Sequence, residues 1–171
     1  MKIQKGQSLV EILVVTTIVL IVAGISAPFI GTSLHRIKDT QILNHMLGLI
    51  AFARSAAVFT HHTTLLCSGA EACSGSPIWT GNLLVLHDYN GNGQIDADEP
   101  LLRREQLPDG YTWHWHSFRK LTHMPYEPDG TSKAANGRLT LCRSGQPVEQ
   151  IVISLSGRTR HQSPDGKARC G

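Results

Sequence analysis

The sequence of 171 residues lacks the common signatures of an enzyme active site. It has no G-x-S-x-G nucleophile elbow, no phosphate-binding loop and no H-E-x-x-H metal pair. Its four cysteines include no C-x-x-C pair, which argues against a redox dithiol and against a structural zinc site. Its nine histidines are scattered, and we expect His61 and His62 at a polar helix end rather than on a metal. We therefore predict a protein that is not an enzyme and has no cofactor, apart from one candidate calcium loop described below.

The chain also carries little net charge, +3 at pH 7, but its C-terminal part is basic. From position 138 onward, six cationic residues accompany only Glu149 and Asp165, which leaves a net charge of +4. The cationic residues are Arg138, Arg143, Arg158, Arg160, Lys167 and Arg169. A local excess of this kind attracts polyanions even when the whole chain is nearly neutral.

The chain has one long apolar run, residues 9–30, and Glu11 is its only ionisable group. An ordinary secretory signal is cleaved after its apolar region, whereas here the processing point lies before it. The run can span a bilayer, which needs about 20 apolar residues, and Lys2 and Lys5 keep the leader cytoplasmic. A plain single-pass membrane anchor, with the remainder of the chain sent outward, is one interpretation. Glu11 argues against a plain anchor, because a carboxylate near the hydrocarbon is costly and usually has a partner.

These N-terminal residues resemble the signature of type IV pilins. The family pattern is a basic leader that ends in glycine, here Gly6, followed by an apolar helix with glutamate at the fifth mature position, here Glu11. Pro28 falls where these proteins carry a helix-kinking proline, while Gln7 departs from the usual phenylalanine. The resemblance implies cleavage after Gly6 by a prepilin peptidase and N-methylation of Gln7. It also implies a helix that sits in the inner membrane and then packs with other major and minor pilins in a filament.

Four cysteines in an exported chain suggest disulfides. Three pairings are open. We favour Cys67–Cys73 with Cys142–Cys170, because the first closes a local loop and the second ties the C-terminal tail to a strand.

Hydrophobic periodicity predicts an α+β protein, in which a long N-terminal helix packs on an antiparallel β-sheet. A core-facing helical stripe recurs up to about Thr60, at Ile42, Met46, Leu49, Ile50, Ala53 and Ala57. The predicted strands are 64–67, 83–87, 101–106, 111–116, 118–122, 138–143 and 148–154, with turns at three Pro-Asp-Gly sequences and a hairpin at Asn136-Gly137. The domains are a leader (1–6), a hydrophobic helix (7–30), its amphipathic continuation (31–60) and a β-rich domain (61–171). This is the type IV pilin-like architecture.

The last predicted strand leads directly into Gly157-Arg158-Thr159-Arg160. In an extended strand, Arg158 and Arg160 would project side by side, about 7 Å apart, which suits successive phosphates of a nucleic acid. Ordinary solvated arginines at a strand end are the alternative.

The chain as a whole resembles the GspH/FimT family of minor pilins and pseudopilins, in its pilin N-terminus, its Asp/Asn-rich segment and its closing Gly-Arg-x-Arg. FimT-type members bind DNA through that motif in natural transformation. The resemblance implies DNA binding. Because nothing in the sequence resembles a recognition helix, we expect binding led by phosphates with little sequence preference, and four to six such contacts would give a log–log salt slope of roughly −4 to −5. The implied DNA-binding residues are Gly157, Arg158, Arg160, Lys167, Arg169 and Arg143. The alternative is a GspH-like structural minor pilin or type II secretion pseudopilin that primes filament assembly at the tip, with Glu11 in assembly.

Two further patterns have two interpretations each. Residues 88–99 fit the EF-hand sequence D-x-[DN]-x-[DN]-G-x5-E, so they form either a tight turn capped by side chains or a Ca²⁺ site. The oxygen ligands of that site would be Asp88, Asn90, Asn92, Asp96 and Glu99. In residues 113–116, Trp and His alternate, and we expect Trp113 and Trp115 to pack on the helix rather than to stack on bases.

Overall fold

The computed structural model describes residues 8–92, 96, 99–132, 135–166 and 168–170, and the side chains of all of these except 25–32. The chain divides into two compact units, Met1–Lys38 and Asp39–Gly171, and one long helix contributes to both. The elements in chain order are α1 (Leu9–Thr60), β1 (Thr63–Ser68), β2 (Ile78–Trp79), β3 (Asn82–Asp88), β4 (Leu101–Gln106), β5 (Tyr111–Ser117), β6 (Met124–Tyr126), β7 (Gly137–Arg143), β8 (Gln146–Ile153) and β9 (Thr159–Gln162).

The first unit consists of the N-terminal part of α1. The Ser8 carbonyl accepts hydrogen bonds from the Glu11 and Ile12 amides, and Glu11 lies in the first turn, where a carboxylate is favoured by the helix dipole. The stretch Leu9–Gly24 is apolar and its large side chains are exposed, whereas the predicted processing residues Gly6 and Gln7 lie outside the described residues. Ser33–Thr60 is also long and apolar enough to cross a membrane. Length and composition are weak evidence that Ser33–Thr60 crosses a membrane, because one face of this stretch forms the core described next.

In the second unit, one face of α1 is buried along its whole length, as the helical periodicity predicts. The buried positions include all six of the predicted stripe, Ile42, Met46, Leu49, Ile50, Ala53 and Ala57. The helix ends at Thr60 because His61 adopts a left-handed backbone conformation, with φ of 58°.

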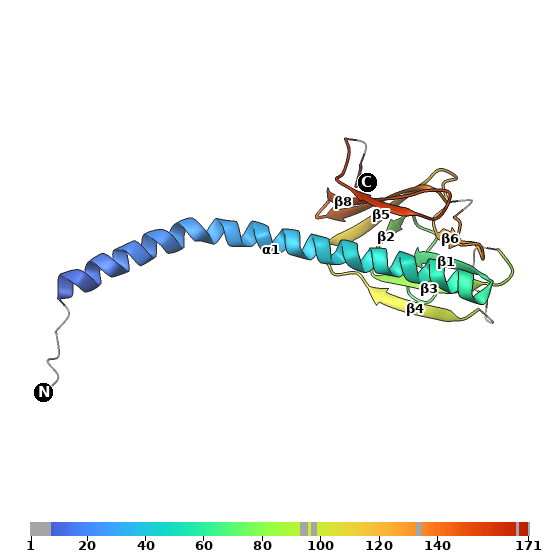
Figure 1. Cartoon of the computed structure of the whole chain (residues 1–171), viewed down its shortest axis with the longest axis horizontal. Helices are drawn as coiled ribbons and strands as arrows, with labels where there is room; N and C mark the ends of the chain where they lie inside the picture. Colours follow the sequence, from blue (N-terminus) through green and yellow to red (C-terminus); the bar gives the residue numbers. More distant parts are fainter. Residues whose placement is uncertain (1–7, 93–95, 97–98, 133–134, 167, 171) are drawn as a thin grey trace, which may run out of the picture. The chain divides into compact units, whose positions relative to one another are not determined.

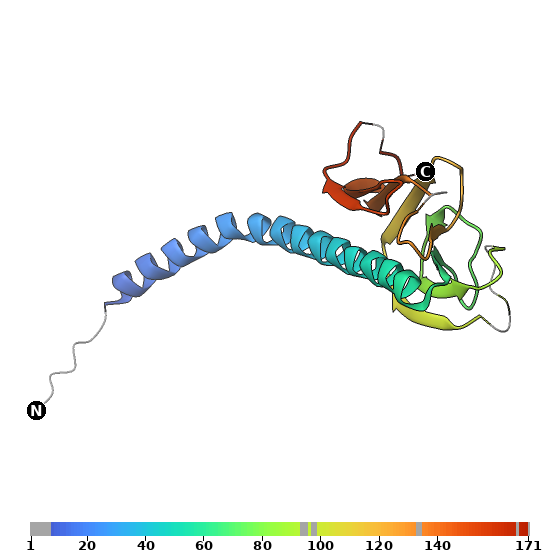
Figure 2. The same ribbon diagram turned by 45° about the vertical axis from the view of Figure 1, so that its right-hand side comes forward.

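Two antiparallel sheets pack on this face, where we predicted one. The four-stranded sheet has the order β4-β3-β1-β6, and the five-stranded sheet has the order β2-β5-β7-β8-β9. Figures 1 and 2 show β3 and β4 on one side of the C-terminal half of α1 and the five-stranded sheet on the other. A single apolar cluster joins the three layers, with Leu66 and Val85 from the first sheet and Leu139 and Ile151 from the second.

Several predicted strands need correction. The strand expected at 118–122 is wrong: residues 118–119 form a turn, and the strand lies further on as β6. The short strand β2 was not predicted. Asn136-Gly137 is not a hairpin turn, because Gly137 begins β7 and packs against the His116 carbonyl. The β7–β8 hairpin instead turns at Ser144 and Gly145, whose φ values of 49° and 77° suit a two-residue turn.

A buried carboxylate joins the start of this part of the helix to the five-stranded sheet. Asp39 is only 5% exposed and lies on α1. It accepts a hydrogen bond of 2.9 Å from the Tyr111 hydroxyl and one of 2.7 Å from the Arg143 guanidinium. Burial and the bond to Asp39 raise the pKa of the Tyr111 phenol, which therefore stays a donor. The two bonds fix the helix against β5 and β7 at one end of the sheet.

Replacing Asp39 should destabilise the second unit. In Asp39→Ala, Tyr111 and Arg143 lose a shared acceptor in a largely buried setting, so we expect the free energy of unfolding to fall by about 2–4 kcal/mol. Chemical denaturation followed by circular dichroism measures this change. Glu71→Ala, at an exposed loop position, is the matched control and should have little effect. Equal unfolding midpoints for the two variants would contradict the anchoring role.

Candidate nucleic-acid interface

The Gly-Arg-x-Arg segment lies in a hairpin, not in a continuation of the last strand. The strand β8 ends at Ile153, the chain turns through residues 154–157, and β9 returns antiparallel to β8. Inside the turn, the Gly157 amide donates to the Ser154 carbonyl, and the Ser154 side chain accepts the Arg158 amide at 3.2 Å. The predicted spacing survives this correction, because Arg158 and Arg160 are still two residues apart on an extended backbone.

Gly157 is required at this turn for two physical reasons. Its φ of 74° lies in the left-handed region, which favours glycine. A Cβ atom there would also lie 2.3 Å from the Gly130 carbonyl oxygen and 3.0 Å from the ring of the buried Tyr126. The glycine of the motif therefore positions the arginines through backbone shape and close packing.

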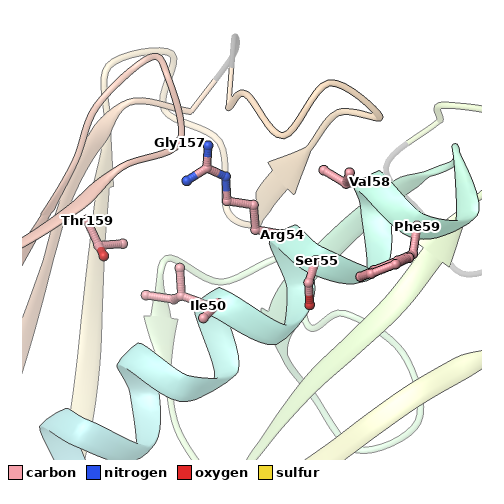
Figure 3. A pocket seen from close by; sticks show the side chains of 8 residues that line it. Ile50, Arg54, Ser55, Val58, Phe59, Gly157 and Thr159 are labelled. Atoms are coloured by element: carbon pink, nitrogen blue, oxygen red, sulfur yellow. The ribbon is translucent and has the colours of Figure 1, made fainter.

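Two other elements hold the turn in place. Ser132 donates from its amide to the Leu155 carbonyl at 3.1 Å and from its hydroxyl to the Ser154 carbonyl at 2.8 Å. From the helix, the Arg54 guanidinium donates to the Ser156 carbonyl at 3.3 Å. Figure 3 shows Arg54 reaching from α1 toward the turn at Gly157, beside a groove of about 420 Å³. Three contacts thus fix the backbone from which the arginines project.

Arg158 and Arg160 point into solvent. Both side chains are exposed, and Arg160 donates to the Gln162 side chain at 3.1 Å. Among the residues that the structure describes, no acidic side chain forms an ion pair with either arginine. Their guanidinium groups are therefore available to an anionic ligand.

The C-terminal tail crosses the same face of the sheet. Asp165 forms an ion pair of 3.0 Å with Arg138 on β7, and Cys170 forms a disulfide with Cys142 near the end of that strand. Arg169 is exposed on this tail next to Cys170, whose partner Cys142 is four residues, or about 13 Å, along β7 from Arg138, while Lys167 lies outside the described residues. The tail is tied to the sheet as we predicted, and Arg169 adds a cation toward its other end.

The position of Arg143 does not fit the predicted DNA contact. It lies at the end of β7, six residues or about 20 Å from Gly137, the residue that is level with the start of β9. Its guanidinium turns to the helix side of the sheet and pairs with Asp39. The geometry assigns Arg143 a structural role, because the buried carboxylate of Asp39 neutralises its guanidinium.

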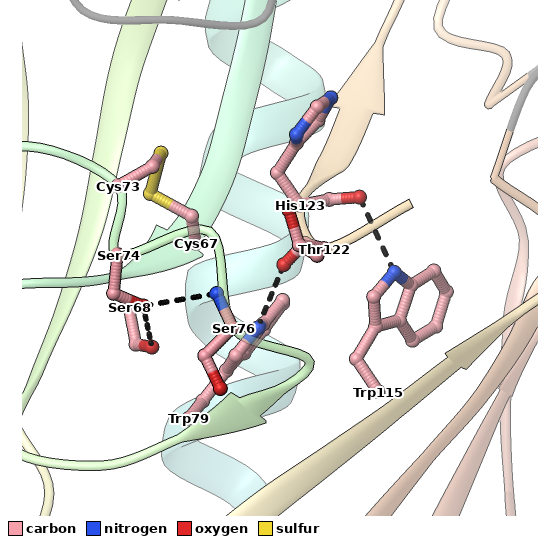
Figure 4. The surroundings of a disulfide bond; sticks show 9 residues. All are labelled: Cys67, Ser68, Cys73, Ser74, Ser76, Trp79, Trp115, Thr122 and His123. Carbon is pink, nitrogen blue, oxygen red and sulfur yellow. Dashed lines mark hydrogen bonds between the residues drawn. A yellow bond between two sulfur atoms is a disulfide. The ribbon is translucent and has the colours of Figure 1, made fainter. Parts of the chain in front are cut away.

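The structure also tests the other predicted disulfide and the predicted packing of the tryptophans. Cys67 and Cys73 are bonded, so the favoured pairing of all four cysteines is confirmed. Figure 4 shows this disulfide beside Trp79, whose indole N–H donates to the Thr122 carbonyl, and Trp115, which donates to the His123 carbonyl. Trp113 and Trp115 are at most 1% exposed, so base stacking on them is wrong and packing on the helix is confirmed.

The candidate calcium loop has its five side chains close together. The side-chain amides of Asn90 and Asn92 both donate to one carboxylate oxygen of Asp96. The amides of Tyr89 and Asp96 donate to the two oxygens of Glu99, as in a capped turn. Residues 93–95 and 97–98 lie outside the described part, and the described residues contain no group of three or more His, Cys, Asp and Glu side chains placed to hold a metal. Calcium binding stays a prediction, which calorimetric titration with CaCl₂ tests.

Two supporting residues of the turn were missed from the sequence. Arg54 had a usable signal, because it is a lone cation in an otherwise small and apolar helical segment, 50–59. Ser132 had none, since its partners lie 22 residues away and depend on the tertiary fold.

The sequence of the chain matches two models of known protein families. Residues 43–157 match the family model described as type II transport protein GspH. Residues 1–27 match the prokaryotic N-terminal methylation motif. No curated protein is significantly similar to the chain in sequence.

Two solved structures are similar in fold, both of the type IV minor pilin FimU of Pseudomonas aeruginosa strain PAO1. The crystal form in space group P65 superposes with a TM-score of 0.55 at 18% identity, over 75% of this chain and 96% of the other. The form in space group P21 gives a TM-score of 0.56 at 17% identity, over 75% and 91%. At this identity the likeness shows the fold, which is the predicted pilin architecture.

Substitution at Gly157 should separate backbone strain from steric clash. Gly157→Ala introduces both, whereas Gly145→Ala introduces a similar strain at φ of 77° with open space around the new Cβ. We expect Gly145→Ala to lower the free energy of unfolding by about 1 kcal/mol and Gly157→Ala by about 2–4 kcal/mol. Denaturant titration of both variants measures the difference. Equal losses would mean that the packing against Gly130 has no energetic consequence.

Proposed function

The chain belongs to the GspH family of type II transport proteins, and from this premise we propose that it is a minor pilin that binds DNA without sequence preference. In this proposal it supports DNA uptake by a type IV pilus during natural transformation. The observation that carries the proposal is that Arg158 and Arg160 are exposed, form no ion pair within the described part of the chain, and lie on a turn held from three sides. Gly157 of the motif shapes the turn from which the two arginines project.

Binding of this kind would be led by phosphates. Arg158, Arg160, Arg169 and Lys167 give four cations, and four phosphate contacts correspond to a log–log salt slope of about −4 on duplex DNA. The described residues include no helix placed on this sheet face that could read base edges, so sequence preference is not expected. Single-site affinity would be weak, and several copies along one filament would add avidity.

The N-terminal segment supplies the assembly part of the proposal. Prepilin peptidase would cleave after Gly6 and the new N-terminus at Gln7 would be methylated, consistent with the match of residues 1–27. Glu11 would then serve insertion of the apolar helix into a filament of other pilins. Before assembly, the helix would reside in the inner membrane with the second unit on the periplasmic side.

The double substitution Arg158→Gln/Arg160→Gln tests the DNA contact. We expect it to weaken binding of a labelled duplex about tenfold or more and to reduce the magnitude of the salt slope by about 2, because two charge-assisted contacts are lost. Fluorescence anisotropy with the full chain in non-ionic detergent, across a salt series, gives both quantities.

The matched control is Arg103→Gln/Arg104→Gln, which removes the same charge from β4 in the other sheet and should leave binding nearly unchanged. If the two double variants lose affinity equally, the effect is one of net charge and the motif assignment fails. In cells, a deletion strain that loses piliation or secretion but takes up DNA normally would favour a purely structural pilin or pseudopilin.

A further inference from the structure

Arg160 on β9 is the edge of a longer row of residues on the outward face of the five-stranded sheet. Strand register places His116, Arg138, Val152 and Arg160 directly opposite one another across β5, β7, β8 and β9. With about 4.8 Å between strands, the row is about 14 Å long. Its inward neighbours, such as Trp115, lie in the core, so the side chains of the row point away from α1.

This row is open and cationic. His116 and Arg160 are exposed, and the Arg138 side chain is 43% exposed. The acidic group that faces the row is Asp165 of the tail, which pairs with Arg138 and is itself partly exposed. Because that ion pair is at the surface, a phosphate can compete for the guanidinium at little cost.

An exposed aromatic side chain continues the same face. The Phe118 amide donates to the Asn136 carbonyl at 2.9 Å, so the β5–β7 pairing extends one residue beyond the strand. Phe118 comes two residues after the outward-facing His116, and although it begins the turn, this bond keeps its amide in the register of the strand. Its side chain is 83% exposed.

The segment that carries Phe118 is held in one conformation and bears charge. The Ser117 hydroxyl accepts the amides of Arg119 and Leu121, and Lys120 closes the turn with φ of 57° and a bond to the Ser117 carbonyl. One exposed phenylalanine alone means little on a protein surface. Here it follows the outward His116 by two residues and directly precedes two exposed cations, Arg119 and Lys120, and proteins bind unpaired nucleic acid with exposed aromatic side chains beside cations.

We propose that this outward face, from β9 to β5, is a track for single-stranded DNA. Arg158, Arg160 and Arg138 contact successive phosphates, and Phe118 stacks on a base that only an unpaired strand can present. The inference rests on the proposed DNA-binding function and deepens it, since it names the form of DNA that the site prefers.

Three probes test it with the full chain in non-ionic detergent: a labelled oligo-dT, a duplex of equal charge, and an abasic oligonucleotide with the same backbone. We expect the parent to prefer oligo-dT, and Phe118→Ala to weaken that binding about fivefold or more. Binding of the duplex and of the abasic strand should not change. Phe118→Trp should restore oligo-dT binding, with quenching of the new indole fluorescence.

The matched control is Phe59→Ala, because Phe59 is equally exposed, at 86%, but lies on α1 beside the groove of Figure 3. It should bind all three probes like the parent. For the row, Arg138→Gln should reduce the salt slope on oligo-dT by about 1, whereas Arg104→Gln on the other sheet should not.

The outcomes separate this inference from the function on which it rests. If Phe118→Ala binds oligo-dT as tightly as the parent, or if the parent prefers the duplex, the track is overturned while Arg158→Gln/Arg160→Gln still reports on DNA binding. If that double variant also binds like the parent, the assignment of DNA binding to the Gly-Arg-x-Arg motif is wrong, and if the parent binds none of the three probes, the DNA-binding function itself is wrong.

Discussion

The second unit is built around the buried face of α1, whose side chains become smaller toward the end of the helix. Large residues such as Met46 and Ile50 fill the space between the two sheets. One to two turns further along the helix, the buried positions are the small residues Ala53 and Ala57. Small side chains let neighbouring backbone approach closely. It is here that the loop at Gly130 comes within reach of the helix, and that Gly157 packs on that loop. The taper of the helix face therefore determines where the turn before β9 can lie.

The inward face of the five-stranded sheet belongs to the core, and its outward face carries the proposed binding residues. Thr159 and His161 pair with core residues of β8 and lie on the inward side, whereas Arg158 and Arg160 alternate to the outward side. The cations are thus held by a rigid backbone without taking part in the core. Changes of charge on the outward face should leave the fold intact, which is why binding can be examined there by substitution.

The parts of this fold that could be predicted from the sequence depend on local periodicity or on short-range closure. The helical stripe, the inward tryptophans and the Cys67–Cys73 loop are of this kind, and all are confirmed. The division into two sheets was not predictable, because β1 pairs with β6 some 60 residues away. The error at Phe118 has a local cause instead, since a serine hydroxyl and a left-handed Lys120 end the strand.

The candidate site shows the same limit. The sequence predicts the pair Arg158 and Arg160 through their spacing of two and through the resemblance to the Gly-Arg-x-Arg motif. It also included Arg143, an equally basic residue of the same C-terminal part. Only the tertiary structure shows that Asp39, 104 residues earlier, already neutralises Arg143. Charge composition can therefore indicate that a region is basic, but which cations are free depends on partners that periodicity does not locate.

Weak DNA binding by each subunit, as we propose, is consistent with the assembly of many subunits in one filament. A few phosphate contacts and one stacking side chain give modest affinity in a single copy, and strong salt dependence. When subunits are held in one assembly, the second and later contacts become intramolecular, so that affinity rises without new residues. Each single contact can still open quickly, which lets a strand move relative to its carrier. For the DNA uptake that we propose, in which DNA is bound and then released, several weak sites would serve better than one tight site.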